Sequence, residues 1–326
     1  MKDPIRYFAI TAAGMFLLPM TVLLRPSAEA AESDKKSLEK NEYTSFYNIY
    51  RTNSETVETV PVRDYLIGAV AAEMPASYEP EALKAQVIAS HTYAERICTL
   101  LRSQPDPALN GADFSDDSSQ YQAFYSEDEL RTLWGERFSQ NYEKITDAVD
   151  AVGDIILYYD DEPIVAAFHA VSAGATESAA SVWGTGLPYL VSVPSESDTA
   201  SPQYESTVEL TAETVRAALS ATRQSVTFPD DPAAWFRILS ATDAGTVLSV
   251  VGGSEVWTGQ QIREALALRS ACFEITFENG VFQITTKGYG HSVGMSQFGA
   301  NQMALSGSDY REILEHYYPG TELRGT

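Results

Sequence analysis

The sequence predicts an α+β fold, in which helices and antiparallel hairpins surround a groove. Apolar residues at helical spacing and strand-like alternations follow one another without the regular strand–helix–strand order of a doubly wound sheet. Two pairs of strand-like runs are separated by short polar turns, which is typical of antiparallel hairpins. With 326 residues, 44% of them hydrophobic, the chain can form one large domain or two ordinary ones.

The first elements of the core are predicted from local patterns between residues 57 and 101. Apolar and polar residues alternate over 57–62, which predicts a strand. Helical spacing of apolar residues predicts one helix over 63–73 and a second over 80–101. Pro80 suits the first turn of the second helix, because the amide that proline lacks has no helical partner there.

The middle of the chain is predicted to form a helix and a hairpin. After a polar loop at 103–119, Ser126 caps a helix and Glu129 completes a capping box. Two strand-like runs between 155 and 171 are joined by an acidic tight turn at 160–162. The pattern is weakest over 205–285, where we expect a helix at 212–219, strands within 240–251, a helix at 259–268 and paired strands at 272–288.

The N-terminus carries a membrane-targeting segment. Lys2 and Arg6 precede an apolar run from Tyr7 to Leu24, which has about the minimum length for a spanning helix. The Ala-Glu-Ala at 28–30 resembles a signal-peptidase site, so a retained N-terminal membrane helix and a cleaved signal both stay open. The positive flank predicts a single-pass protein of the cell membrane whose bulk is extracytoplasmic.

These patterns divide the chain into segments. We expect residues 1–31 to be the membrane anchor or signal, and 32–55 to be a polar tether with one short ordered piece around Phe46 to Ile49. Residues 56–326 form the functional domain, within which 205–285 is a candidate subdomain.

The charge and cysteine content restrict the function. The net charge of −23 is spread along the chain and leaves little basic surface to neutralise phosphates, which argues against a nucleic-acid partner. The two cysteines, Cys98 and Cys272, are too few for a disulfide scaffold. They are either two separate buried thiols or one bridge in an oxidising compartment, and the sequence leaves both open.

Glu73 is the first candidate for chemistry. It ends the helix predicted over 63–73, directly before Met74 and Pro75. The negative end of the helix dipole and the apolar neighbours both raise the pKa of a carboxyl in this place. Such a group can donate a proton near neutral pH, whereas the structural alternative is a surface glutamate that ends a helix.

Further candidates lie on the second helix and in two later segments. Lys84 and His91 are seven residues apart, close to two helical turns, and are expected on one stripe distinct from the apolar face. The glycine-rich segment 287–305 contains His291, Ser296 and Gln297, and the segment 166–193 contains His169, Ser172 and Tyr189. Polar groups on such turns suit a polyhydroxylated ligand, although a structural turn or an aromatic core is the alternative.

Other catalytic classes are not supported. None of the four histidines has a recognised metal-ligand spacing, so no metal or other cofactor is expected. No serine lies in a nucleophile elbow, and neither cysteine has catalytic surroundings. Acid–base catalysis by Glu73 is the catalytic hypothesis that remains.

Four stretches closely resemble the stage II sporulation protein D family. They include "VPVRDYLIGAVAAEMPASYEPEALKAQVIASHTYA", "PIVAAFHAVSAGATESAASVWG" with "PYLVSV", "TGQQIREALALRSACFEI", and "KGYGHSVGMSQFGANQMALSGSDYREILEHYYPGT". The resemblance runs from about Val57 to Thr321. It implies a membrane-anchored lytic transglycosylase that cuts peptidoglycan glycan strands lacking stem peptides during sporulation engulfment, leaving 1,6-anhydro-muramic ends.

The resemblance also implies residue roles and partners. Glu73 matches the family's catalytic acid, and the expected glycan contacts in a substrate groove are Lys84, His91, His169, Ser172, Tyr189, His291, Ser296 and Gln297. A sporulation protein P type amidase and a protein M type membrane partner are implied as well. The alternative function is a non-catalytic glycan-binding scaffold that stimulates a cell-wall amidase.

The chain departs from the family pattern at three positions. His91 stands where arginine is common, which exchanges a fixed charge for a titratable ring. Ser172 stands where many relatives have cysteine, so a soft ligand is lost where some members hold zinc, and we expect no zinc. Ser292 replaces a usual glycine after His291, which puts the geometry of that turn in doubt.

Overall fold

The structure is a computed structural model that describes residues 46–325. The chain folds as two compact units. The described residues up to Ala167, with 304–315 and 320–325, form unit 1, and residues 168–303 with 316–319 form unit 2. The predicted membrane segment 1–31 lies outside the described residues. Within residues 46–325, no helix combines the length and the apolar character needed to cross a bilayer.

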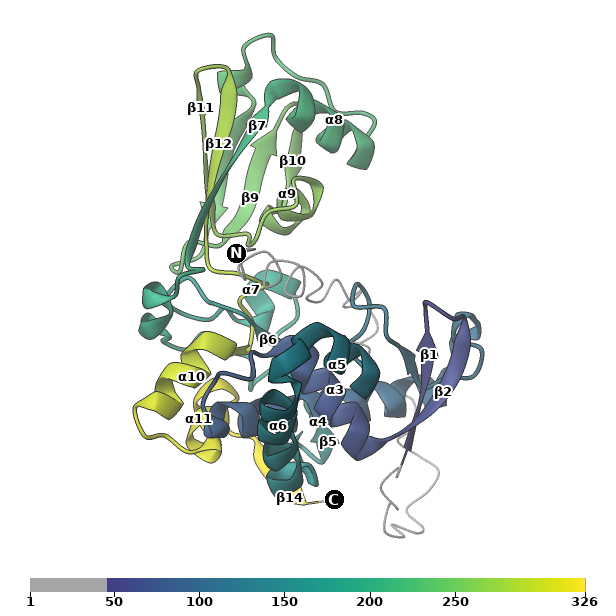
Figure 1. The fold of residues 1–326 in the computed structure, drawn as a ribbon. Helices are drawn as coiled ribbons and strands as arrows, with labels where there is room; N and C mark the ends of the chain where they lie inside the picture. The colour runs from purple at the N-terminus through teal and green to yellow at the C-terminus, as the bar shows by residue number, and fades with distance from the viewer. Residues whose placement is uncertain (1–45, 326) are drawn as a thin grey trace. The chain divides into compact units, whose positions relative to one another are not determined.

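Unit 1 combines four helices of its own with two small sheets (Figure 1). Its helices are α3 (Val62–Glu73), α4 (Pro80–Ser103), α5 (Glu127–Trp134) and α6 (Phe138–Val152). Its strands are β1 (Phe46–Arg51), β2 (Thr56–Pro61), β3 (Phe114–Ser115), β4 (Ile155–Tyr159), β5 (Glu162–Pro163) and β14 (Glu322–Gly325). The sheets have the orders β2-β1-β3 and β14-β4-β5.

The helices α3 and α4 form the centre of unit 1. The residues of α3 from Tyr65 to Val70 are all buried. The helix ends because Met74 takes an extended conformation before Pro75, as residues preceding proline usually do. Helix α4 begins with Pro80, as predicted, and packs against α6 and β4.

Unit 2 contains two three-stranded antiparallel sheets and one short parallel pair. The sheets have the orders β11-β12-β7 and β10-β9-β8, and β13 pairs with β6. The strands are β6 (Phe168–His169), β7 (Glu205–Thr211), β8 (Phe236–Ala241), β9 (Val247–Gly252), β10 (Glu255–Trp257), β11 (Phe273–Glu278), β12 (Val281–Lys287) and β13 (Met295–Ser296). The helices are α7 (Ala179–Trp183), α8 (Ala212–Thr222) and α9 (Gly259–Ala265).

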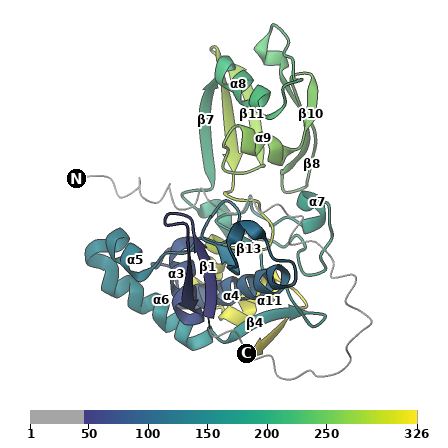
Figure 2. The same ribbon diagram turned by 90° about the vertical axis from the view of Figure 1, so that its right-hand side faces the viewer.

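The strands β7 to β12 surround an apolar core of their own, with α8 and α9 beside them (Figure 2). Trp235, Trp257 and Phe282 are almost fully buried in this core. Two further helices, α10 (Gln297–Leu305) and α11 (Tyr310–Tyr317), each contain one of the points at which the chain passes between the units.

The mixed helical and antiparallel architecture confirms the predicted α+β class, while the N-terminal membrane helix stays a prediction. The capping box of Ser126 and Glu129 is present at α5. The strand expected up to residue 171 is wrong in its extent, because 164–167 are irregular between β5 and β6. Strand β1 lies inside the expected tether, where it pairs with β2. Cys98 and Cys272 are two separate buried thiols.

Candidate functional site

Glu73 is the last residue of α3 and remains partly exposed. Its Oε1 accepts a hydrogen bond of 3.2 Å from the amide of Ala123. Burial raises the pKa of the Glu73 carboxyl to about 7, and the Ala123 hydrogen bond opposes this rise by favouring the ionised form. A carboxyl with this pKa is half protonated near neutral pH, so it can give a proton and take one back.

Three phenols lie near this carboxyl. The charge of Glu73 contributes to the raised pKa values of Tyr65, Tyr93 and Tyr125, although burial is the largest cause for each. These phenols therefore stay protonated at neutral pH. Among residues 46–325 Glu73 forms no ion pair, so burial alone raises the pKa of its carboxyl.

The loop that holds Glu73 is itself fixed by buried hydrogen bonds. Gln122 donates to Ser90 Oγ at 2.6 Å, and its Oε1 accepts from the hydroxyl of Tyr65 at 3.2 Å. One residue later, the Ala123 amide points at Glu73. No local pattern in the sequence marks this loop, because only the fold brings it to a helix that lies about fifty residues earlier in the chain.

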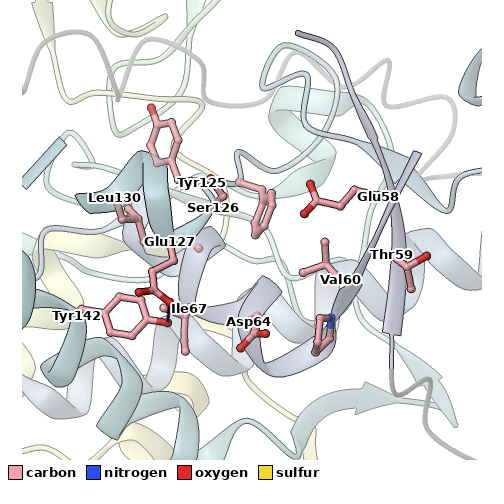
Figure 3. A pocket seen from close by; sticks show the side chains of 13 residues that line it. Glu58, Thr59, Val60, Asp64, Ile67, Tyr125, Ser126, Glu127, Leu130 and Tyr142 are labelled. Carbon is pink, nitrogen blue, oxygen red and sulfur yellow. Dashed lines mark hydrogen bonds between the residues drawn. The ribbon is translucent and has the colours of Figure 1, made fainter. Parts of the chain in front are cut away.

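A pocket of about 210 Å³ adjoins the same loop, as Figure 3 shows. Phe124, Tyr125 and Ser126, which follow Ala123, line it together with residues of β2, α3, α5 and α6. Its acidic groups come from Glu58, Asp64 and Glu127, and none of the described residues that line it is basic. No local pattern in the sequence marks this pocket, since its walls come from three separate stretches of the chain, 58–68, 124–130 and residue 142.

The structure separates Lys84 from His91. Lys84 is partly exposed and forms an ion pair of 2.6 Å with Glu81. His91 is buried, and its Nε2 lies 3.8 Å from the carboxylate of Glu95. The expectation that both side chains lie on one stripe distinct from the apolar face is therefore wrong for His91, which is buried where α4 packs against its neighbours.

In unit 2, His169 and His291 lie side by side with ring centroids 5.8 Å apart. The carbonyl of Val293 can only accept, so it identifies His169 Nδ1, at 3.2 Å, as the protonated nitrogen. The Val293 amide donates to His291 Nδ1 at 3.0 Å. Burial lowers the pKa of His169 to about 4 and that of His291 well below its usual value, so both rings are neutral at pH 7.

The glycine-rich turn brings the two histidines together. Gly290 has a φ of +118°, and a Cβ there would lie 2.6 Å from the Cβ of His169. Ser292 has a φ of 64°, in the region that favours glycine. This conformation accounts for the glycine that is usual in the family at this position. The chain keeps this turn conformation with serine in place of glycine.

A buried carboxylate links other predicted residues of unit 2. Asp198 Oδ2 accepts from the Ser172 amide at 2.7 Å. Burial raises the pKa of Asp198, and hydrogen bonds from Ser172, Ser296 and Ser195 oppose this rise. Asp198 thereby connects Ser172 with the start of α10. Asp198 was not among the predicted site residues, because a lone aspartate in a polar segment carries no local signal.

The predicted contacts of unit 2 are all buried in the structure. His169, Ser172 and Ser296 have no exposed surface, and Gln297, Tyr189 and His291 are 3%, 5% and 8% exposed. The structure brings His169 to His291 and Ser172 to Ser296, while Tyr189 and Gln297 are buried in the segments beside them. In residues 46–325, no group of three or more His, Cys, Asp or Glu side chains could hold a metal ion.

Comparisons with known proteins identify the relatives of this chain. A family model described as stage II sporulation protein matches residues 50–159. The stage II sporulation protein D of Bacillus subtilis (strain 168) is 37% identical over 302 residues, which cover 93% of this chain and 84% of that protein. The protein of the same name from Bacillus amyloliquefaciens is 38% identical over 275 residues, covering 84% of this chain and 77% of the relative.

A more distant relative is the amidase enhancer of Bacillus subtilis (strain 168). It is 25% identical over 317 residues, covering 79% of this chain and 40% of that protein. The two sporulation proteins align over most of their own length at more than 35% identity. The chain therefore belongs to the stage II sporulation protein D family.

Proposed function

We propose that the chain is a peptidoglycan lytic transglycosylase that cleaves glycan strands lacking stem peptides, with Glu73 as its acid and base. The observation that carries this proposal is a partly exposed carboxyl whose pKa burial raises to about 7, with no contribution from another carboxylate among the described residues. A single carboxyl of this kind is sufficient for a transglycosylase, whereas most glycosidases that use water need two.

The reaction needs one proton to be given and returned. Protonated Glu73 donates to the glycosidic oxygen, and the bond between that oxygen and C1 of the muramic acid breaks. The 6-hydroxyl of the same sugar then attacks C1, and the Glu73 carboxylate takes the hydroxyl proton. The products are a strand with a free hydroxyl and a strand with a 1,6-anhydro-muramic end, and Glu73 is again protonated.

The surroundings of Glu73 support both steps. The Ala123 amide holds the ionised carboxylate between the two proton transfers, and burial keeps the protonated form populated at neutral pH. The pocket beside the 122–126 loop offers aromatic rings and acidic hydrogen-bond acceptors to sugar hydroxyls (Figure 3). We expect the glycan strand to lie along this part of unit 1.

The test is product analysis. The full chain is incubated with stem-stripped glycan strands, and mass spectrometry is used to look for 1,6-anhydro ends. Glu73→Gln should give no such ends while still binding the strands, whereas Glu143→Gln, a change at an exposed position of α6, should cleave as the wild type does. If Glu73→Gln cleaves as well as the wild type, the assignment of the acid is wrong.

A second candidate is a glycan-binding scaffold that stimulates an amidase without cutting. The likeness to a protein named amidase enhancer favours it. In that case the wild type gives no anhydro ends, but a cell-wall amidase works faster on strands that carry this protein. The same assay with a purified amidase therefore separates the two candidates.

The cellular setting is part of the proposal. The names of the sporulation relatives support a role in sporulation. We further propose that this role is in engulfment, with a protein P type amidase and a protein M type membrane protein as partners. We place the chain in the cell membrane as a single-pass protein, with its bulk extracytoplasmic at the interface of forespore and mother cell. The mass of the mature protein tells whether the first residues stay attached.

A further inference from the structure

Arg263 in α9 is a guanidinium that forms no ion pair with any carboxylate of the described residues. Its Nε donates to the carbonyl of Leu268 at 3.4 Å and its Nη1 to Gln260 Oε1 at 3.3 Å, which are long and neutral contacts. Among residues 46–325, no carboxylate forms an ion pair with it. Burial lowers the pKa of this guanidinium, although part of the side chain stays exposed.

The contrast with Arg51 makes this arrangement informative. Arg51 is also largely buried, but it pairs with three carboxylates, those of Glu58, Asp116 and Glu129. The chain carries a net charge of −23, so acidic side chains are abundant. A largely buried positive charge without an ion pair destabilises the fold, because its desolvation is not compensated. An anion that pairs with the guanidinium offsets this desolvation free energy.

Arg263 lies beside the histidine pair of the same unit. The Leu268 amide donates to the Arg263 carbonyl at 2.8 Å, and the Gly290 amide, one residue before His291, donates to the carbonyl of Arg269 at 3.0 Å. The segment that follows Arg263 therefore lies against the turn that carries His291, and the charge of Arg263 contributes to the lowered pKa values of both His169 and His291. The ring of Trp183, which is partly exposed, lies 5.4 Å from that of His291. A partly exposed aromatic ring and a guanidinium therefore lie near the two buried imidazoles.

His169 gives an independent sign of a ligand. Because its Nδ1 donates to the Val293 carbonyl, its Nε2 is an acceptor. This nitrogen is buried and has no hydrogen-bond partner among the described residues. Buried acceptors in folded proteins are nearly always satisfied, so a donor such as a hydroxyl is expected to reach it.

We propose that Arg263, with Trp183 and His169, forms a site for the lactyl carboxylate of a muramic acid whose stem peptide has been removed. This inference rests on the proposed function and names the group by which the substrate is recognised. Removal of the stem peptide turns a neutral amide into a carboxylate, which is the geometry that a guanidinium binds best. The sugar also supplies hydroxyl donors for His169 and an apolar ring face for Trp183.

The site then explains a preference for stripped strands. A peptide-bearing muramic acid offers an amide in place of the charge and adds bulk at the same position. Arg263 is a specificity-determining residue in this view, and it takes no part in the proton transfers at Glu73.

The test measures binding instead of cleavage. The full chain with Glu73→Gln is titrated with stem-stripped strands, and separately with the same strands after their carboxylates have been capped as methyl amides. We expect the free carboxylates to bind about tenfold to a hundredfold more tightly, the range for a charge-assisted hydrogen bond. Adding Arg263→Gln should abolish this preference, and Arg263→Lys should keep part of it.

The matched control is Arg216→Gln, a change at an exposed arginine of α8 that lies over the rings of Phe228 and Trp235. It should leave the preference intact. The inference is overturned if Arg263→Gln weakens the binding of both kinds of strand equally, or if it leaves the preference for free carboxylates unchanged. It is also overturned if the chain binds neither kind of strand. Cleavage by the wild-type chain is a separate measurement, so the proposed function can fail or hold independently.

Discussion

The Glu73 region of unit 1 and the histidine region of unit 2 use burial in opposite ways. Burial moves the pKa of Glu73 to about 7 while the side chain stays partly exposed, so its proton is available near neutral pH. Burial moves the pKa of His169 to about 4, and that ring has no exposed surface. Desolvation always disfavours the charged form, which brings an acid toward neutrality and takes a histidine away from it.

Under the proposed function, this difference gives the two regions distinct tasks. Proton transfer belongs to unit 1 in that proposal, where a titratable group works close to its pKa. The neutral imidazoles, the serines and Asp198 in unit 2 then serve architecture and ligand recognition. Four predictions test this comparison, in order of decreasing expected effect.

The largest effect is expected from Glu73→Gln on turnover. Removing the acid should lower the rate of anhydro-end formation by about a hundredfold to ten-thousandfold, the usual contribution of general acid–base catalysis. The affinity for stripped strands should change little, because glutamine keeps the shape of the side chain. His169→Gln should instead change affinity more than turnover, and an equal loss of turnover in both variants would contradict the division.

Gly290→Ala should destabilise unit 2 by about 3 kcal/mol, because the new methyl group meets the Cβ of His169 in a backbone conformation that L residues rarely adopt. Thermal unfolding measures this change. The matched control is Gly307→Ala, where φ is also positive at +102° but nothing lies within 4 Å of the new Cβ. A similar loss in both variants would show that the backbone strain, and not the contact with His169, is responsible.

Glu73→Gln should also stabilise the fold at alkaline pH. Below the ordinary carboxyl pKa of 4.5 both folded and unfolded chains are protonated, whereas above about 7 the folded chain holds a charge in a buried place. Folding stability therefore falls as pH rises between these values. We expect the variant to gain about 2 kcal/mol at pH 8 and little at pH 4. Denaturant unfolding at both values checks this, and an equal gain at both would argue against a raised pKa.

The smallest effect concerns the pH dependence of the wild type. The donor form of Glu73 is the protonated one, so cleavage should fall by up to tenfold for each pH unit above about 7. Initial rates between pH 6 and 9 measure the slope. The neutral imidazoles of His169 and His291 do not titrate in this range, and His291→Gln should leave the midpoint of the profile unchanged.

Local patterns predicted much of the fold. The helices α3 and α4 and the capping box at Ser126 follow from periodicity and from side chains close in the chain, and all three are present. The irregular stretch after β5 was missed, because an apolar run reads the same whether it forms a strand or a buried loop.

Part of the candidate site was equally accessible to sequence analysis, and part was not. Glu73 and the glycine-rich turn were identified from the helix end and from glycine density. Asp198, Arg263 and the Ala123 amide were missed. Each acts on residues that lie far away in the chain, so nothing in its own neighbourhood marks it.

The amino-acid sequence by itself determined where α3 stops, which acid stands at that end and to which family the chain belongs. These depend on proline, periodicity and residue identity, which are properties of short segments. Only the tertiary structure decided that burial raises the pKa of Glu73 to about 7, that His91 is enclosed and that Arg263 forms no ion pair with a carboxylate among residues 46–325. The physical reason is that desolvation and charge pairing depend on every group within a few ångströms, whatever its distance along the chain.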